Sequence, residues 1–322
     1  MNRKPVVLCP IDFSEASRGA LRYAAAIAEH FESEVTVATV NDPLLSDADT
    51  LTAGEGHLAA ETAQEMERFF RETFADRPKG IAHARFESAT GTPPAEILGL
   101  AVRTHADVIV MSSHGATGVR KLFFGSTAER VLRETSVPVL VTPAGDAGPA
   151  LLSDVRKTVR RVVAPVDLSE ASARQVRLAS GLAQALDVSL LLLHIVEPVR
   201  SARPGWLPRP NVDSERRDRA ERQLESMIGT LPGRAKAEAL VVFGEPSEEI
   251  AKVTHDRDAG LIVMGLHASP LLGPRMGSVT YRVLCLAHVL VLALPPVPVG
   301  TGTAGVRADR RDAGGIAGGA VA

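Results

Sequence analysis

The sequence contains few cysteines, few aromatic residues and little net charge, and each shortage argues against a class of protein. Its 322 residues include two cysteines, Cys9 and Cys285, which do not make a disulfide framework and are typical of a reducing compartment. Aromatic residues make up 4 % of the chain, too few for base-stacking platforms. The formal net charge of −2 argues against general electrostatic binding to nucleic acid or to an anionic membrane.

Long apolar runs are also lacking. No run approaches the roughly 20 residues of a membrane-spanning helix, and the start MNRKPVVLCPIDFSE interrupts its apolar residues with proline and aspartate, unlike a signal peptide. We therefore expect a soluble, cytoplasmic protein that binds neither nucleic acid nor membrane. The hydrophobic share of 45 % is sufficient for a core, and the length predicts about two domains.

The chain contains an internal repeat of one unit in two tandem copies. PVVLCPIDFSEASRGALRYAAAIAEHF returns as RRVVAPVDLSEASARQVRLASGLAQAL, which pairs Asp12 with Asp167, and LFFGSTAERVLRETSVPVLVTP returns as PRMGSVTYRVLCLAHVLVLALPP. A seam rich in glycine, proline and acids lies at 144–154. We expect one domain at 1–145, a second at 155–298, and a disordered tail at 299–322, where bulky apolar residues are scarce.

Strand and helix patterns alternate within each copy. In the first copy, strands are expected at 6–11, 35–40, 84–90, 107–111 and 137–143, and helices at 14–31, 59–74, 91–105 and 126–135. Ser14 is placed to cap the first helix, and Pro93 or Pro94 suits the first position of the third. Because three strands are almost continuously apolar, both sheet faces should be covered by helices. The predicted fold class is α/β, with two tandem doubly wound parallel five-stranded sheets of Rossmann-like type.

Two loops at the carboxyl ends of strands are candidates for a ligand site, because open parallel sheets bind ligands there. One is PIDFS, with Asp12, and the other is SSHGATGVRKLFFGST at 112–127, whose glycines expose backbone amides before a helix start. Arg120 and Lys121 could add positive charge. Two other interpretations stay open: the glycines serve as turn residues, and Asp12 is a second capping carboxylate beside Ser14.

Other chemical signatures are missing from the sequence. There is no GxxxxGK[ST] phosphate loop and no GxSxG nucleophile elbow, and GEGHLA at 54–59 follows no strand. The histidines and cysteines show no metal-ligand spacing. We predict no catalytic residue and no metal site.

The motifs resemble those of the universal stress protein family in its tandem, two-domain form. The nucleotide-binding branch of that family carries G-x-x-G, nine residues, then G-[ST]; here Ser112 to Gly115 is followed by nine residues and then Gly125-Ser126, with Ser112 replacing the first glycine. The resemblance implies ATP, with or without Mg²⁺, as the ligand of the first domain. The residues that it implies are, for the adenine, Pro10, Ile11 and Asp12; for the base or ribose, Val40; and for ribose and phosphates, Met111, Ser112, Gly115, Gly125, Ser126 and Thr127.

The second copy departs from the motif. Gly265-Leu266-His267-Ala268 has lost the second glycine, and eight residues with two prolines precede Gly277-Ser278. Asp167 and Val196 are taken as the counterparts of Asp12 and Val40. We expect this copy to bind ATP weakly or not at all, and to act mainly as a packing partner.

The resulting functional hypothesis is an ATP-binding universal stress protein that acts in stress response, with the nucleotide as a regulatory ligand. The alternatives are a nucleotide-free interaction scaffold and a slow ATP hydrolase, a weak ATPase at most. The resemblance also implies that the fifth strand of each copy lies at a sheet edge. We therefore expect the two domains to pair through these strands, with a homodimer as a further option.

Overall fold

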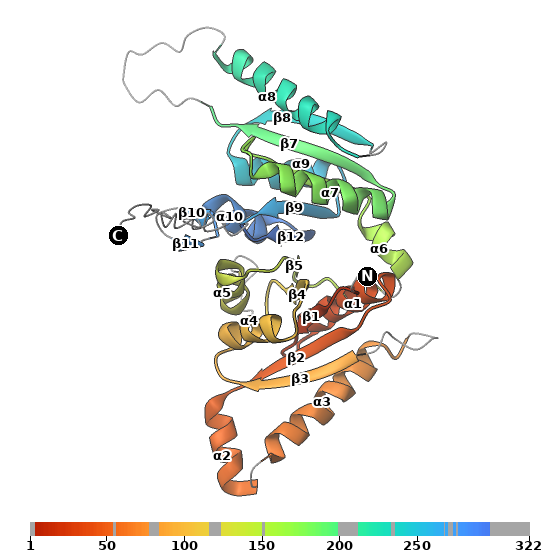
Figure 1. Ribbon diagram of the computed structural model, residues 1–322, viewed down its shortest axis with the longest axis vertical. Helices are drawn as coiled ribbons and strands as arrows, with labels where there is room; N and C mark the ends of the chain where they lie inside the picture. Colours follow the sequence, from red (N-terminus) through yellow and green to blue (C-terminus); the bar gives the residue numbers. More distant parts are fainter. Residues whose placement is uncertain are drawn as a thin grey trace, which may run out of the picture.

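The computed structural model describes residues 4–53, 56–76, 84–115, 124–149, 152–198, 212–232, 236–266, 268–269, 273–274 and 276–296. The two halves of the chain are stacked along the long axis of the molecule (Figure 1). The predicted tail at 299–322 and the loop cations Arg120 and Lys121 lie outside the described residues.

A ten-stranded sheet runs through both halves, in the order β3-β2-β1-β4-β5-β12-β9-β6-β7-β8. The strands of the first half are β1 (Val7–Pro10), β2 (Val35–Asn41), β3 (Ala84–Thr90), β4 (Val108–Ser112) and β5 (Val139–Thr142). Those of the second are β6 (Arg161–Pro165), β7 (Ser189–Val196), β8 (Ala237–Phe243), β9 (Leu261–Gly265) and β12 (Leu290–Leu294). All five strands within each half are parallel, which confirms the predicted α/β class.

The two five-stranded halves meet at a single antiparallel pair. β5 lies beside β12 with Leu140 opposite Leu292, and Val139 and Val141 are opposite Ala293 and Val291. These side chains are buried, and each of the two hydrophobic clusters in the protein draws residues from both halves. The core is therefore continuous across the joint.

Helices cover both faces of the sheet. One cluster packs under α1 (Glu15–His30), α3 (His57–Thr73), α7 (Ser172–Leu186) and α8 (Val212–Gly229). The other packs under α4 (Pro93–Arg103), α5 (Ser126–Glu134), α9 (Pro246–Asp256) and α10 (Ser278–Leu286). This is the doubly wound arrangement that the apolar strands predicted. Among the described residues, no helix is long and apolar enough to cross a bilayer.

The predicted starts of two helices are confirmed. Ser14 is the N-cap of α1, and its hydroxyl oxygen accepts a hydrogen bond from the backbone N–H of Ser17 at 3.2 Å. Proline occupies the first turn of α4, where the missing N–H has no intrahelical partner to lose. Both caps begin helices directly after strands that lead into the candidate site.

Four elements were not predicted from the sequence. α2 (Pro43–Ala53) forms where no helix was predicted, and α6 (Leu152–Thr158) forms at the end of the seam. In the second half, β10 (Ala268–Ser269) and β11 (Gly273–Pro274) form a short antiparallel pair. The seam before α6 packs on α1, since the Tyr23 hydroxyl donates to Asp146 at 2.9 Å.

Candidate functional site

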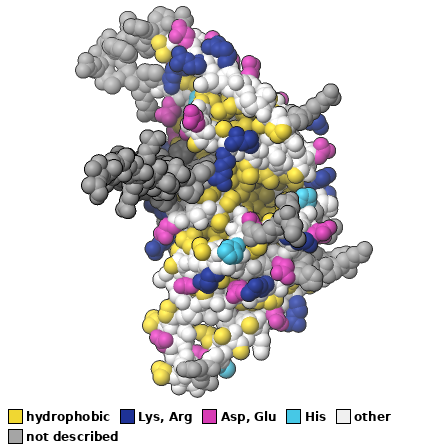
Figure 2. Space-filling view, viewed as in Figure 1, with side chains coloured by type: hydrophobic (Ala, Val, Ile, Leu, Met, Phe, Trp, Pro, Cys, Tyr) yellow, Lys and Arg dark blue, Asp and Glu magenta, His cyan; other side chains and the backbone are white. Residues whose placement is uncertain are grey.

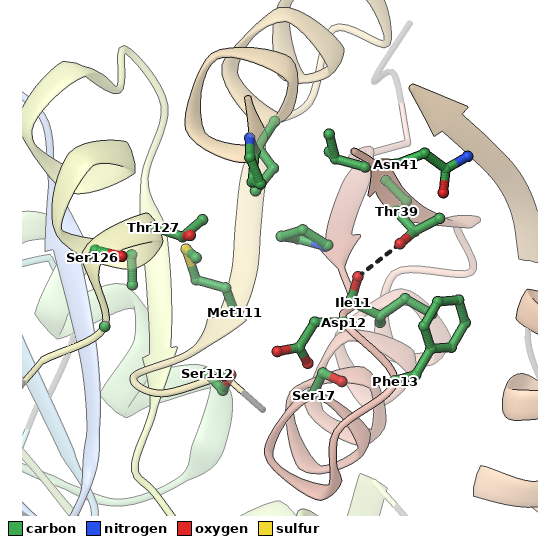
Figure 3. A pocket seen from close by; sticks show the side chains of 18 of the residues that line it. Ile11, Asp12, Phe13, Ser17, Thr39, Asn41, Met111, Ser112, Ser126 and Thr127 are labelled. Atoms are coloured by element: carbon green, nitrogen blue, oxygen red, sulfur yellow. Dashed lines mark hydrogen bonds between the residues drawn. The ribbon is translucent and has the colours of Figure 1, made fainter. Parts of the chain in front are cut away.

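A cavity of about 460 Å³ opens at the carboxyl ends of β1, β2 and β4. All ten residues predicted for the site line it: Pro10, Ile11, Asp12, Val40, Met111, Ser112, Gly115, Gly125, Ser126 and Thr127. They come from four separate stretches of the first half. Figure 3 shows Ile11, Asp12 and Thr39 on one side of the gap, and Met111, Ser112, Ser126 and Thr127 on the other.

The gap arises from the topology of the sheet. β1 has β2 on one side and β4 on the other, so the chain order reverses at β1. β1 and β4 pair only at Val7–Val108 and Leu8–Ile109, before the strands reach the site. The loops that follow β1 and β4 therefore leave the sheet on the two sides of an open crevice.

Asp12 is held in place by its neighbour Ser14. Its Oδ1 accepts hydrogen bonds from the Ser14 backbone N–H at 3.2 Å and from the Ser14 hydroxyl at 2.5 Å. Phe13 between them has a positive φ of 61°, which turns the chain sharply after the strand. Ser14, rather than Asp12, caps the amide of Ser17, so Asp12 supports the cap from outside the helix. The carboxylate points into the crevice (Figure 3).

Two glycines allow the second loop to approach closely. A Cβ on Gly115 would lie 2.5 Å from Asp12 Oδ2, and a Cβ on Gly125 would lie 3.1 Å from the carbonyl oxygen of Ser113. The first distance is too short for any side chain without movement of the loop or of the carboxylate. Glycine at 115 is therefore needed for the two loops to meet without displacement of the Asp12 carboxylate.

The start of α5 borders the cavity with backbone amides. Gly125 is the N-cap and supplies no side-chain hydrogen bond, so the first amides of α5 have no capping side chain. Ser126 and Thr127 add hydroxyl groups beside these amides. The positive end of the helix dipole and the N–H groups together suit an anion.

Ser112, which stands in place of the first motif glycine, has a role inside the loop. Its hydroxyl donates to the carbonyl oxygen of His114 at 2.6 Å and so closes the turn after β4. The serine side chain is thus engaged with the loop's own backbone. The replacement keeps the turn compact beside the cavity.

Several lining residues were missed by the sequence reasoning. The Thr39 hydroxyl donates to the Ile11 carbonyl at 3.1 Å and ties β2 to the Asp12 turn (Figure 3). Leu45 of α2 and Leu58 of α3 add apolar wall, with Pro93 and Ile97 of α4. Thr39 breaks the apolar pattern of β2 and could have been found by that signal; the wall from α2 could not, because no helix was predicted there.

Cys9 lies directly before the site and takes no part in its surface. It is buried, and burial raises the pKa of its thiol, so it remains protonated at neutral pH. Among the described residues, no group of three or more histidine, cysteine or acidic side chains is arranged to hold a metal ion.

In the second half, a side chain bridges the two strand ends that border the equivalent crevice. The Gln175 amide donates to the carbonyl oxygens of Pro165 and Val263, at 2.5 and 2.9 Å, and so bridges the ends of β6 and β9. The position of Thr39 is taken by His194, whose Nδ1 lies 2.8 Å from the Val166 carbonyl. The loop after β9 folds onto itself through the β10–β11 pair.

The strand register corrects one equivalence between the halves. Val7 pairs with Val35 and Val162 with Leu190, so the counterpart of Val40 is Ile195, and Val196 corresponds to Asn41. The run LLLLHIV has no alternation of apolar and polar residues, so its pattern did not define the register. The prediction for Val196 was wrong by one residue.

Comparison with known proteins identifies the family. The model of the universal stress protein family matches the chain twice, at residues 5–143 and 158–295. The chain belongs to the universal stress protein family. These matches agree with the tandem repeat, while the exact domain boundaries at 1–145 and 155–298 stay predictions.

Individual relatives resemble one half or the whole fold. A universal stress protein of Methanocaldococcus jannaschii is 32 % identical over 137 residues, which cover 42 % of this chain and 79 % of the relative. A universal stress protein of Mycobacterium tuberculosis H37Rv is 31 % identical over 130 residues, 38 % of this chain and 43 % of the relative.

Among solved structures, a universal stress protein from Archaeoglobus fulgidus aligns over 92 % of this chain and 98 % of its own, with a TM-score of 0.63 and 21 % identity. A protein of unknown function from Pseudomonas aeruginosa aligns over 90 % of this chain and 92 % of its own, with a TM-score of 0.63 and 15 % identity. At these identities the likeness supports the tandem fold.

Proposed function

We propose that the first half binds ATP as a regulatory ligand and that the protein acts through it in stress response. The observation that carries the proposal is the convergence of ten motif residues on one cavity, with the Asp12 carboxylate facing the glycine loop. A volume of about 460 Å³ lies within the usual range of small-molecule sites, about 300–1,000 Å³.

The base would lie at the β1–β2 side of the cavity. Val40, Leu58 and Ile97 supply apolar surface there, as flat aromatic ligands need. The adenine 6-amino group is a hydrogen-bond donor, and Asp12 supplies the acceptor through the carboxylate that Ser14 orients. Guanine has a carbonyl oxygen at that position, so the site should prefer adenine.

The phosphates would lie toward α5. Backbone N–H groups at the start of α5, with the hydroxyls of Ser126 and Thr127, match phosphate oxygens. Mg²⁺, where present, would be held mainly by the phosphates themselves, as is usual for nucleotide-bound magnesium. Hydrolysis is outside this proposal, and a weak ATPase activity is the alternative that a turnover assay tests.

One nucleotide per chain is expected. In the second half Gln175 and His194 occupy positions that Ala20 and Thr39 hold in the first, and the loop amides pair within β10–β11. Ala268 stands at the sequence position that Gly115 holds in the first half. The second half would then serve as a packing partner through β12.

Calorimetric titration of the full chain with ATP tests the proposal. We expect one site per chain, and at least tenfold weaker binding for Gly115→Ala, since its Cβ would lie 2.5 Å from Asp12 Oδ2. Gly181→Ala is the matched control, because a Cβ there meets nothing within 4 Å. No ATP binding by the wild type at millimolar concentration would refute the proposal and leave the nucleotide-free scaffold.

Pairing of the two domains within one chain is also proposed, on the strength of the β5–β12 contact. Because each strand covers the edge of the other, the chain has no need of a second copy at this joint. A homodimer and the cytoplasmic location stay predictions. Light scattering of the purified chain would distinguish the monomer from the dimer.

A further inference from the structure

α2 is a helix that buries none of its described side chains. It spans Pro43–Ala53, and every residue described in it is exposed or only partly covered. An isolated helix of this length is marginal in water, and most helices are stabilised by packing an apolar face. In Figure 1 α2 lies at one end of the molecule, beyond the edge strand β3.

Polar contacts fix the position of α2. The Asp42 carboxylate accepts from the Leu44 N–H at 2.8 Å at the start of the helix. Asp49 accepts from the Leu58 N–H at 2.7 Å and lies 3.0 Å from the His57 ring, which ties α2 to the start of α3. The helix is therefore held in one orientation without using its leucines.

The leucines of α2 form an exposed stripe. Leu44, Ala48 and Leu51 follow the i, i+4, i+7 spacing of one helix face, and Leu44 and Leu51 are 77 % and 87 % exposed. Leu45 flanks the stripe and also lines the cavity. At the α2 end of the molecule, Figure 2 shows several separate apolar side chains on the surface. We call Leu44, Ala48 and Leu51 the α2 stripe.

The charged residues of α2 and of the position just before it all have one sign. The sequence has no lysine or arginine between Arg22 and Arg68, whereas Asp42, Asp47 and Asp49 lie in or beside α2. A complementary surface must therefore be apolar at its centre and basic at its rim. An anionic lipid surface fails this requirement, since it would repel the aspartates.

A second copy of this chain also fits poorly. Two α2 stripes packed together would bring Asp47 of each copy toward the other. The three side chains of the stripe also offer far less than the about 800 Å² per partner of a stable interface. A groove that surrounds the helix on three sides buries more of it than a second helix can.

We infer that α2 is a docking helix for another protein, one that presents an apolar groove with lysine or arginine at its rim. Leu44 and Leu51, about two helical turns apart on one face, insert their side chains into the groove. Asp47 pairs with the basic rim. This inference does not require nucleotide binding, so its failure and that of the ATP proposal are separate.

Photo-crosslinking from the stripe tests the inference. The full chain would carry a benzophenone amino acid in place of Leu51, and in a second sample in place of Val102, an exposed side chain on α4 (67 %). After irradiation in the cells that make the protein, we expect an adduct with one other polypeptide at position 51 and none at 102. That polypeptide would then be purified for binding measurements.

The binding measurements decide the outcome. We expect Leu51→Asp and Asp47→Lys each to weaken binding at least tenfold, and added salt to weaken wild-type binding more than that of Asp47→Lys. The inference would be overturned by the absence of an adduct at position 51, by crosslinking to a second copy of this chain, by equal adducts at both positions, or by an affinity that neither substitution changes. Retention of the protein on vesicles of anionic lipid, lost in Leu51→Asp, would overturn it in favour of a membrane surface.

Discussion

Replacing Asp12 by asparagine should change which base the site prefers. In the wild type, Oδ1 accepts two hydrogen bonds from Ser14, and Oδ2 lies on the side of Gly115, across the crevice. In Asp12→Asn the amide oxygen must take the Ser14 side, because both Ser14 groups are donors. The NH₂ group then faces the base. It cannot accept a hydrogen bond from the 6-amino donor of adenine, but it can donate one to the 6-oxo acceptor of guanine.

The size of the effect follows from the chemistry of that one contact. Hydrogen bonds to charged groups contribute about 1.5–3 kcal/mol. Asp12 is exposed in this structure, so water competes for it and the lower end applies. We expect about 1.5 kcal/mol, roughly a tenfold loss of ATP affinity, together with a gain in GTP affinity.

Calorimetric titration with ATP and GTP in parallel measures the ratio of the two affinities. The double variant Asp12→Asn with Ser14→Ala is the control: it removes the hydroxyl donor and keeps the backbone N–H of residue 14, so the amide oxygen is held by one donor instead of two and part of the ATP preference should return. Loss of the helix cap costs about 1 kcal/mol of stability, but it does not by itself change base preference. An ATP-to-GTP ratio that is the same in the wild type and in Asp12→Asn would refute the reasoning.

The remaining predictions concern stability. Tyr23→Phe removes the hydrogen bond to Asp146 and should lower the free energy of unfolding by about 1.5 kcal/mol in urea titrations, whereas equal stability would show that the seam does not depend on it. Burial and then the charge of Asp146 raise the pKa of Tyr23, so the wild type should lose stability as the pH rises above about 10, where the unfolded tyrosine ionises first, and Tyr23→Phe should lose less. Leu292→Asp places a charge opposite Leu140 at the β5–β12 joint and should lower the free energy of unfolding by more than about 3 kcal/mol, seen as a lower urea midpoint or as aggregation. The same change at the exposed Leu286 should lower it by less than about 1 kcal/mol. Similar losses of stability in both variants would contradict the assigned joint.

The sequence was informative where local chemistry decides the structure. The cap at Ser14 and the proline at the start of α4 act within a few residues, so both could be predicted. The two site loops could be predicted because glycine spacing and an aspartate after a strand are local signals, and the parallel sheet brings strand ends to one edge. Val40 and Met111 were implied only by the family resemblance.

Other features depend on contacts between distant residues. The need for glycine at 115 comes from Asp12, about a hundred positions away, and no pattern near Gly115 shows it. α2 was missed because its leucines stay largely exposed and its aspartates are typical of a linker, although Asp42 and Pro43 form a recognisable helix start. The contacts of Gln175 could not be predicted either. A glutamine in a helix is ordinary, and only the fold brings the ends of β6 and β9 within reach of its side chain.

The β5–β12 joint has a consequence for how the two copies can diverge. In an assembly of two identical subunits, every substitution in a ligand loop occurs twice and alters both sites. Here one polypeptide supplies both sides of the joint, so a substitution after β9 alters one crevice only. Joining the two domains in one chain therefore allows one domain to lose ligand-binding residues. That domain is still needed, because its strand β12 covers the edge of β5.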